Sequence, residues 1–317
     1  MADITSVEMR TRLLGFEMKN PVIAASGTFG FGKEFSRYTG LDKLGGISIK
    51  GLTLEPRRGN PPPRIAETPS GILNSVGLQN PGVHAFVRDE LPFLRAVDGL
   101  RIIANIAGSA LDDYRESVRI LSDAPIDAIE LNVSCPNVKK GGLSFGASER
   151  ELYEAVSCVR PVCKLPLIVK LTPNVTDIGL LARTAESAGA DAISLINTLL
   201  GMKIDVDTRR PVLANNTGGL SGPAVMPVAV RMTWEVAGAV SIPVIGMGGI
   251  ASGEDAVEFM LAGASAVMVG SANFIDPDAC ERVISGICEY CKRSGCPSAA
   301  LLTGALLPWA PRVEEDM

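Results

Sequence analysis

The segment Asp127-Ala-Ile-Glu-Leu-Asn-Val-Ser-Cys-Pro-Asn137 joins a short alternating apolar run to a cluster of polar residues. A strand should end here, because Pro136 cannot donate to a sheet and favours extended backbone at the residue before it. The thiol of Cys135 and the carboxamides of Asn132 and Asn137 would then stand at a strand exit. Taken alone, a free cysteine is more often a small buried hydrophobe. Whether Cys135 is a site residue or a buried hydrophobe therefore depends on the pattern of the rest of the chain.

Short apolar runs rich in Val and Ile recur along the chain and alternate with helical patterns. The eight runs are Pro21–Ser26, Gly46–Lys50, Ile102–Ala107, Ala128–Val133, Leu167–Leu171, Ala192–Asn197, Pro243–Met247 and Ala266–Gly270. The clearest helical patterns are Leu111–Ser122, Ser148–Cys163, Asp177–Ala188 and Gly253–Leu261. Eight such units predict an α/β fold, a single (β/α)8 TIM barrel. The 317 residues show no linker, so we expect one domain over residues 1–317.

Three connections are too long to be simple turns. Thr53–Pro81 follows the second run, Pro136–Gly146 the fourth, and Leu199–Pro223 the sixth. Loops of this length in a compact domain are usually lids or binding elements. We therefore predict loop insertions after strands 2, 4 and 6. The glycines of Lys139-Lys140-Gly141-Gly142 suit the insertion after strand 4 to open and close over a ligand.

Every expected strand end is polar or glycine. The ends are Ser26, Lys50, Asn105, Asn132 with Cys135, Lys170, Asn197 with Thr198, Gly248 with Gly249, and Gly270 with Ser271. Each of them alone fits a solvated strand terminus or a turn residue. In a TIM barrel, however, catalytic groups come from the carboxyl ends of different strands. Eight independent solvated termini or turn residues are a less economical explanation than one ring of functional residues. We therefore predict a ring of site residues at this end of the barrel.

The last two strand ends indicate the class of ligand. Gly248 and Gly249 lead to an expected helix start at Ser252–Asp255, and Gly270 closes the eighth run. Backbone N–H groups freed by glycine and facing a helix N-terminus bind phosphate in this fold. We expect a phosphate-bearing ligand such as a sugar phosphate or flavin mononucleotide (FMN).

Composition argues against several classes of partner. The net charge of −5 gives no basic face for nucleic acid. No apolar run reaches the length of a membrane span, and the first residues lack the features of a signal peptide. We therefore expect a cytoplasmic protein with no nucleic-acid or membrane partner.

The cysteines and the single histidine argue against metal and hydrolase sites. Seven cysteines without a secretory signal predict reduced thiols. Cys288 and Cys291 have metal-ligand spacing and lie near Cys280 and Cys296, but the segment fits an amphipathic helix better, and we expect no metal site. His84 is the only histidine and no Gly-x-Ser-x-Gly is present, so a Ser-His-Asp hydrolase is not expected.

Five motifs together resemble the dihydroorotate dehydrogenase family. They are Asn20–Gly27, Gly59–Arg64, Asn74–Asn80, Asn132–Asn137 and Ile196–Thr198, and the resemblance runs from about Leu13 to Tyr290. Ser26–Gly32 and Leu199–Met202 look like the class 1B form, the catalytic subunit of the NAD-linked enzyme. The membrane-bound class uses a serine base and carries an N-terminal membrane helix, whereas this chain has Cys135 and no such helix pattern. The tail Leu301–Met317 departs from the family pattern.

The resemblance implies oxidation of (S)-dihydroorotate to orotate in pyrimidine biosynthesis. It implies Cys135 as the base that removes the C5 proton, with hydride passing from C6 to N5 of FMN. The implied substrate contacts are Lys50, Asn74, Ser75, Val76, Gly77, Leu78, Asn132, Asn137, Asn197 and Thr198. The implied FMN contacts are Ser26, Lys50, Gly51, Asn105, Asn132, Lys170, Ile196, Gly222, Gly248, Gly249, Gly270 and Ser271. Carboxamides suit a pyrimidine edge that alternates donors and acceptors, and an ammonium suits its carboxylate.

The resemblance also implies a second subunit. It would carry FAD and a 2Fe–2S cluster in a heterotetramer of two catalytic and two electron-transfer chains, and it would pass electrons to NAD⁺. The chain itself has no Gly-x-Gly-x-x-Gly dinucleotide motif.

Three alternative functions stay open. A dihydropyrimidine dehydrogenase-like enzyme shares Ser-Cys-Pro but differs where this chain has Asn137. A tRNA dihydrouridine synthase should carry a basic RNA-binding extension. A non-redox lyase or isomerase, or a barrel retained only for binding, would use the phosphate site without flavin. Bound oxidised flavin, which makes a protein yellow, separates the last of these from the other readings.

Overall fold

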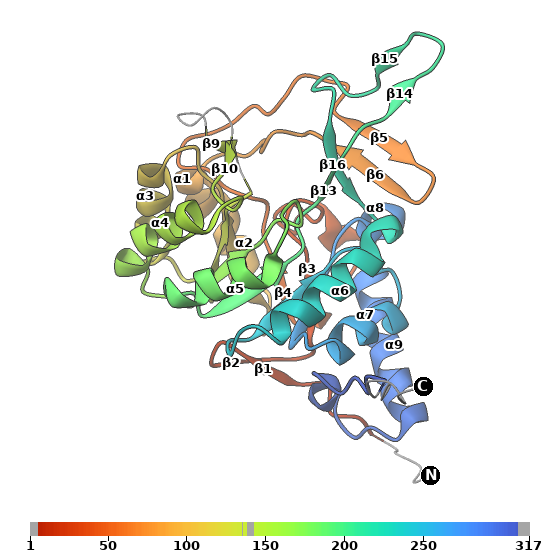
Figure 1. Ribbon diagram of the computed structural model, residues 1–317. Helices are drawn as coiled ribbons and strands as arrows, with labels where there is room; N and C mark the ends of the chain where they lie inside the picture. The colour runs from red at the N-terminus through yellow and green to blue at the C-terminus, as the bar shows by residue number, and fades with distance from the viewer. Residues whose placement is uncertain (1–5, 135, 138–142, 310–317) are drawn as a thin grey trace, which may run out of the picture.

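The computed structural model describes residues 6–134, 136–137 and 143–309, and its centre is a closed barrel of eight parallel strands (Figure 1). The barrel strands are β3 (Val22–Ala24), β4 (Gly46–Ser48), β7 (Arg101–Ile106), β8 (Ala128–Asn132), β11 (Leu167–Lys170), β12 (Ala192–Leu195), β17 (Val244–Met247) and β18 (Ala266–Val269). They pair in chain order, and β18 closes the barrel against β3. Each strand coincides with one of the apolar runs, so the prediction of a TIM barrel is confirmed.

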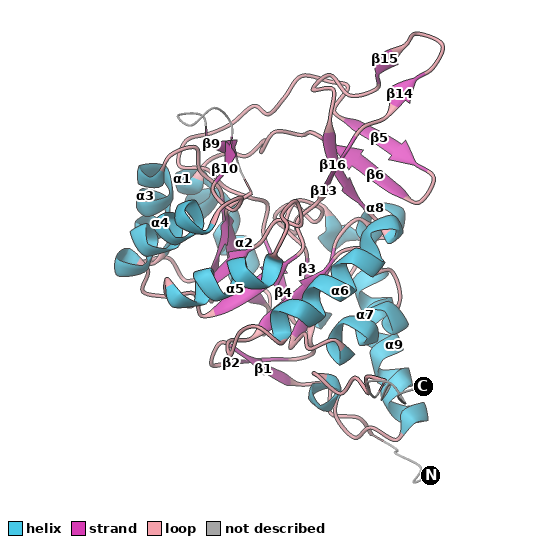
Figure 2. Ribbon diagram, in the orientation of Figure 1, coloured by secondary structure: helices cyan, strands magenta, loops and turns pink. Residues whose placement is uncertain are grey.

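Helices surround the barrel, as the cyan elements of Figure 2 show. The α-helices of the described ranges are α1 (Val83–Ala85), α2 (Leu91–Arg95), α3 (Leu111–Leu121), α4 (Glu149–Val159), α5 (Ile178–Ser187), α6 (Met226–Ala237), α7 (Gly253–Leu261), α8 (Ala272–Ile275) and α9 (Ala279–Ser294). Side chains cap the N-termini of two of the predicted helices, α4 and α5. Ser148 Oγ accepts from Glu151 N at 3.3 Å, and an Asp177 carboxylate oxygen accepts from Leu180 N at 2.8 Å.

Shorter helical turns complete the connections between these elements. They are η1 (Phe35–Arg37), η2 (Leu41–Lys43), η3 (Phe86–Glu90), η5 (Arg160–Val162), η6 (Pro223–Val225) and η7 (Ala299–Leu302). None of the helices in the described ranges is both long and apolar enough to cross a membrane.

A hairpin of β1 (Thr11–Leu13) and β2 (Phe16–Met18) lies at the amino end of the barrel, where sequence analysis predicted no element (Figure 1). Leu13 and Met18 are buried in the same apolar cluster as the inward-facing side chains of the barrel strands, among them Ile23 and Ile103. The hairpin therefore fills one end of the barrel interior and leaves the carboxyl end for a ligand.

The insertions after the second and sixth barrel strands, named the second and sixth insertions after those strands, form a four-stranded antiparallel sheet beyond the carboxyl ends of the barrel strands (Figure 1). Its strands, in spatial order, are β13 (Leu199–Gly201), β16 (Gly218–Ser221), β6 (Gly71–Asn74) and β5 (Ile65–Thr68). A small hairpin, β14 (Ile204–Asp205) and β15 (Arg210–Pro211), extends from it. The fourth insertion contributes β9 (Pro136–Asn137) and β10 (Leu143–Ser144). The pairing of β6 with β16, which joins the insertion after the second barrel strand to the one after the sixth, was not predicted.

The cysteine-rich segment forms the amphipathic helix α9, as predicted, with Cys280 and Cys291 on its buried side. Among the described residues, no group of three His, Cys, Asp or Glu side chains is placed to hold a metal ion. His84, the single histidine, is exposed on α1.

Candidate active site

A cavity of about 880 Å³ lies between the carboxyl ends of the barrel strands and the four-stranded sheet. This volume is in the range of small-molecule sites. The predicted site residues that line it are Ser26, Lys50, Gly51, Asn74, Ser75, Val76, Gly77, Leu78, Asn105, Asn132, Lys170, Ile196, Asn197, Thr198, Gly248, Gly249, Gly270 and Ser271. The folded chain thus brings the predicted strand ends to one cavity.

Three predicted residues are not among those lining the cavity. Gly222 adjoins the lining residue Gly249, because its carbonyl oxygen lies 2.9 Å from the point where a Cβ on Gly249 would stand. Cys135 lies outside the described residues, as do Lys139–Gly142, and for Asn137 only the backbone in β9 is described.

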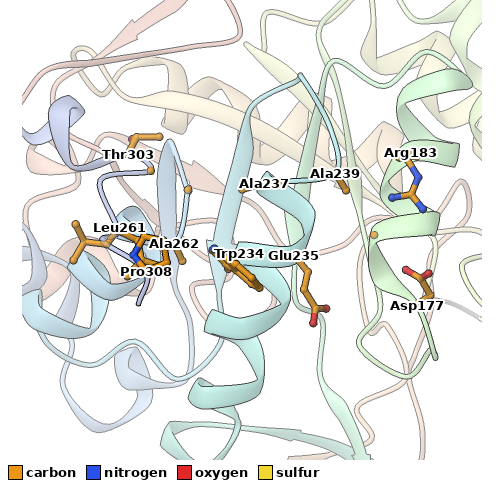
Figure 3. A pocket seen from close by; sticks show the side chains of 15 residues that line it. Asp177, Arg183, Trp234, Glu235, Ala237, Ala239, Leu261, Ala262, Thr303 and Pro308 are labelled. Carbon is orange, nitrogen blue, oxygen red and sulfur yellow. The ribbon is translucent and has the colours of Figure 1, made fainter. Parts of the chain in front are cut away.

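A second cavity of about 720 Å³ lies outside the barrel, between α5, α6, α7 and residues 303–308 (Figure 3). Figure 3 shows Trp234 and Glu235 on one helix and Arg183 and Asp177 across from them. No predicted site residue lines this cavity. We therefore place the chemistry in the cavity at the carboxyl ends of the strands.

Two carboxamides are locked together in the wall of the active-site cavity. Asn197 Nδ2 donates to Asn132 Oδ1 at 3.2 Å, and Asn197 Oδ1 accepts from Thr198 N at 2.8 Å. The backbone of Asn132 is held as well, because its carbonyl accepts from the buried Tyr114 hydroxyl at 2.8 Å. These contacts fix which end of each amide faces which neighbour, as the positioning of a planar ring requires.

The loop 74–78 is held over the cavity by the Gly-Asn-Pro-Pro-Pro-Arg motif. Asn60 Nδ2 donates to Ser75 O at 2.8 Å, and Ser75 N donates to Arg64 O at 2.8 Å. Asn74 Nδ2 reaches Gly219 O at 3.4 Å, which ties the loop to β16. Gly77 has a φ of +77°, and a Cβ there would stand 2.6 Å from Asn60. The motif therefore acts as a support for the loop.

Two lysines line the cavity from the ends of β4 and β11, which are separated by β7 and β8 in the barrel. Lys50 is half-buried at the end of β4, and Lys170 is only 5% exposed at the end of β11. No hydrogen bond or ion pair joins the side-chain ammonium of Lys170 to another residue of the described ranges. Because burying an unpaired ammonium is costly, the cavity is suited to a ligand that supplies acceptors or negative charge near Lys170.

A glycine cradle forms the end of the cavity next to the seventh strand. Gly248 and Gly249 line the cavity, and Gly222 adjoins Gly249. The φ values of Gly222, Gly248 and Gly249 are +104°, +127° and +89°, a region that favours glycine. A Cβ on Gly249 would stand 2.7 Å from Met226 Cβ. The bare backbone therefore leaves room for a ligand to approach closely, as phosphate sites require.

The helix start predicted at Ser252–Asp255 is confirmed, but this first turn does not line the cavity. Asp255 N donates to Ser252 Oγ at 3.1 Å, and Ser252 N donates to the Asp255 carboxylate at 2.8 Å. The first turn of α7 is thus capped by its own side chains, and none of its residues lines the cavity. The short helix α8, which follows Ser271, contributes Phe274 to the lining of the cavity.

Several lining residues were not predicted. Thr172 and Asn174 continue the strand exit after Lys170, and Asn174 anchors the sixth insertion by donating to Thr198 O at 3.0 Å and accepting from Leu200 N at 2.9 Å. Extending the strand-end rule by four residues would have found both. Phe274 gave no comparable signal, since it lies on a helix beyond the last strand.

Comparison with known proteins agrees with this geometry. A profile of the family described as dihydroorotate dehydrogenase matches residues 8–290. Proteins named dihydroorotate dehydrogenase B (NAD(+)), catalytic subunit, from Alkaliphilus metalliredigens and Alkaliphilus oremlandii are 55% and 57% identical to the chain, over 96% and 90% of its length and 100% and 95% of theirs. One of the same name from Bacteroides fragilis is 55% identical over 92% of the chain and 96% of its own length. The chain therefore belongs to the dihydroorotate dehydrogenase family.

Proposed function

We propose that this chain oxidises (S)-dihydroorotate to orotate in pyrimidine biosynthesis, as the catalytic subunit of an NAD⁺-linked enzyme. The observation that carries the proposal is the single cavity in which paired carboxamides, two lysines and a glycine cradle meet. The membership of the family and the names of the relatives support the same activity.

The residues present in the cavity fit FMN as the cofactor. The glycines 222, 248 and 249, with Gly270 and Ser271, would hold its phosphate, and Lys170 would face the part of the ring where negative charge gathers on reduction. Ser26, Lys50, Gly51, Asn105, Asn132 and Ile196 would complete the contacts to the ring. When bound, FMN supplies the acceptor for the hydride that leaves C6 of the substrate.

The chain's own groups would hold the substrate and move its proton. Asn74, Asn132, Asn137 and Asn197 would orient the pyrimidine edge, with Ser75, Val76, Gly77, Leu78 and Thr198 beside them. The Lys50 ammonium would pair with the substrate carboxylate. The thiolate of Cys135 would take the C5 proton, since a thiol with an ordinary pKa of about 8.5 is a workable base at slightly alkaline pH.

Electrons would leave the chain through a partner subunit. The relatives are named as catalytic subunits of an NAD(+) enzyme, which supports a second subunit of a different kind. We propose that it carries FAD and a 2Fe–2S cluster, in an assembly of two catalytic and two electron-transfer chains in the cytoplasm, with no nucleic-acid partner.

The proposal is tested by mixing the purified chain rapidly with dihydroorotate and following the bleaching of flavin. Cys135→Ala should retain flavin and bleach about 10²- to 10⁴-fold more slowly, the usual effect of losing a positioned base. Cys135→Ser should be intermediate and recover at high pH, because a hydroxyl becomes a good base only as it ionises.

The matched control is Cys158→Ala. Cys158 Sγ lies 3.8 Å from Leu111 O and does not line the cavity, so this variant should bleach at nearly the original rate. If Cys135→Ala bleaches as fast as the unmodified chain, the thiol is not the base. A chain that binds no flavin would end the proposal as a whole.

A further inference from the structure

A buried carboxylate in the centre of the barrel has no part in the proposed chemistry so far. Glu130 on β8 has no exposed surface. Its oxygens accept from Ser48 Oγ at 2.7 Å, from Ser194 Oγ at 2.7 Å and from Asn105 Nδ2 at 2.6 Å. These donors come from β4, β12 and β7. A buried carboxylate needs such donors. The donors do not by themselves explain why a carboxylate is placed at this position.

The contact with Asn105 determines which way that amide points. Asn105 and Glu130 are direct neighbours across the pairing of β7 with β8. Because a carboxylate can only accept, the nitrogen of the Asn105 amide must face Glu130 and its oxygen must face away. The flipped amide would set two acceptor oxygens against each other.

The oxygen of this amide has no partner. Asn105 Oδ1 is buried and makes no hydrogen bond within the described part of the chain. It lies 2.8 Å from the point where a Cβ on Gly51 would stand, and both Asn105 and Gly51 line the active-site cavity. Any side chain at Gly51 would cover this oxygen. Buried polar atoms are almost always hydrogen-bonded, so an orphan acceptor beside a ligand cavity indicates a donor on the ligand.

We propose that Glu130 is a positioning residue that makes Asn105 a hydrogen-bond acceptor for an imide N–H of the bound ring. This inference rests on the proposed function, which supplies two rings with an N–H between two carbonyls. One is the N3 position of the flavin, and the other is the N3 position of the pyrimidine. Glu130 touches neither ring. It acts by excluding the amide orientation that would present a donor to the cavity.

The test uses ligands that lack this N–H. FMN and 3-methyl-FMN are titrated by calorimetry into the chain after its flavin is removed, and orotate and 3-methylorotate into the chain as purified. These two titrations are the flavin arm and the pyrimidine arm of the test. If Asn105 Oδ1 accepts from a ring N–H, the unmodified chain should bind the ligand with the N–H more tightly than its 3-methyl form in one of the two arms. Glu130→Gln should weaken binding of that N–H form about three- to tenfold, as expected for one net hydrogen bond. It should also abolish the preference for the N–H form, because the Gln amide can donate to Asn105 Oδ1 and so allow the Asn105 amide to turn.

Two further variants separate positioning from a structural role. Ser194→Ala also removes a hydrogen bond to Glu130, but at the other carboxylate oxygen, so it should keep the preference of the unmodified chain. Asn105→Ala should lose the preference while Glu130 stays in place, which keeps the inference testable if Glu130→Gln does not fold. Thermal unfolding of each flavin-free variant reports the fold independently.

The outcomes distinguish this inference from the proposed function. Loss of preference in the flavin arm assigns the contact to the cofactor, and loss in the pyrimidine arm assigns it to the substrate. If Glu130→Gln and Asn105→Ala fold and keep the unmodified preference in both arms, the inference is overturned. If the unmodified chain binds neither FMN nor 3-methyl-FMN, the flavin proposal fails, while the pyrimidine arm still decides the role of Glu130.

Discussion

At the scale of a single residue, Gly249 shows how a missing Cβ shapes the cofactor end of the cavity. Its φ is +89°, and a Cβ would meet Met226 Cβ at 2.7 Å and Gly222 O at 2.9 Å. We predict that Gly249→Asp loses bound FMN by strain, steric conflict and repulsion of phosphate, while the barrel still folds. Flavin absorbance per chain and circular dichroism measure the two effects.

The control for this variant is Gly238→Ala. Gly238 has an ordinary φ, and the nearest atom that a Cβ would meet lies 3.6 Å away. This variant should keep its flavin. Full flavin content in Gly249→Asp would show that the cradle does not hold the phosphate.

A second prediction at this scale concerns the thiols of α9. Burial raises the pKa of the Cys280 thiol to about 12, and burial next to Cys296 raises the pKa of the Cys291 thiol to about 12. The thiolate is the form that reacts, so a raised pKa keeps both groups protonated and inert at mildly alkaline pH. Iodoacetamide at about pH 8 should leave both unlabelled in the folded chain and label both after denaturation. Peptide mass spectrometry that finds Cys280 labelled in the folded chain would contradict this.

Individual site residues were predictable where the fold fixes their place. Lys50, Asn105 and Lys170 line the cavity as predicted, because each lies at or near the end of an apolar run and parallel strands bring all their ends to one side. Glu130 was not found, because it lies inside such a run. Its hydrogen-bond donors belong to three other strands, and only the closed barrel brings them together.

At the scale of elements, the four-stranded sheet is formed by two insertions that both lie at the carboxyl end of the barrel. Asn74 of β6 pairs with Gly219 of β16, although the two strands are far apart in sequence. The lengths of the insertions were predictable from the spacing of the apolar runs. The sheet was not, because its strands have only three or four residues and β16 begins with two glycines. Such short strands carry no local sequence pattern. Their pairing depends on the barrel, which places the two insertions next to each other.

The sheet should control substrate binding more than cofactor binding. A Cβ on Gly219 would stand 2.0 Å from Thr198 Oγ1, so Gly219→Ala must displace β16 from Thr198 and loosen its contact with Asn74. We predict orotate binding weaker by about tenfold or more, since small displacements of positioning groups are costly, with flavin content unchanged. Titration of the flavin spectrum with orotate measures this, with Gly238→Ala as control. Unchanged affinity for orotate would show that the sheet does not position the substrate.

At the scale of the whole molecule, the two ends of the barrel differ. Leu13 and Met18 fill the amino end, while lysines, carboxamides and glycines line the cavity at the carboxyl end. The eightfold alternation of runs and helical patterns predicted this architecture well, because it is a periodic signal that extends over most of the chain. The hairpin that fills the amino end was missed, since its strands have three residues each.

The last prediction concerns the path of electrons out of the molecule. The sequence has no Gly-x-Gly-x-x-Gly motif, and the relatives are named as catalytic subunits of an NAD(+) enzyme. We predict that dihydroorotate reduces the flavin of the isolated chain but that added NAD⁺ does not reoxidise it at a comparable rate. A soluble dye acceptor should reoxidise the same flavin, which would show that the electrons are available and that only the route to NAD⁺ is missing. Addition of the electron-transfer subunit should restore NADH formation. Fast, direct formation of NADH by the isolated chain would mean that it binds the dinucleotide itself, and the proposed division of labour between two subunits would be wrong.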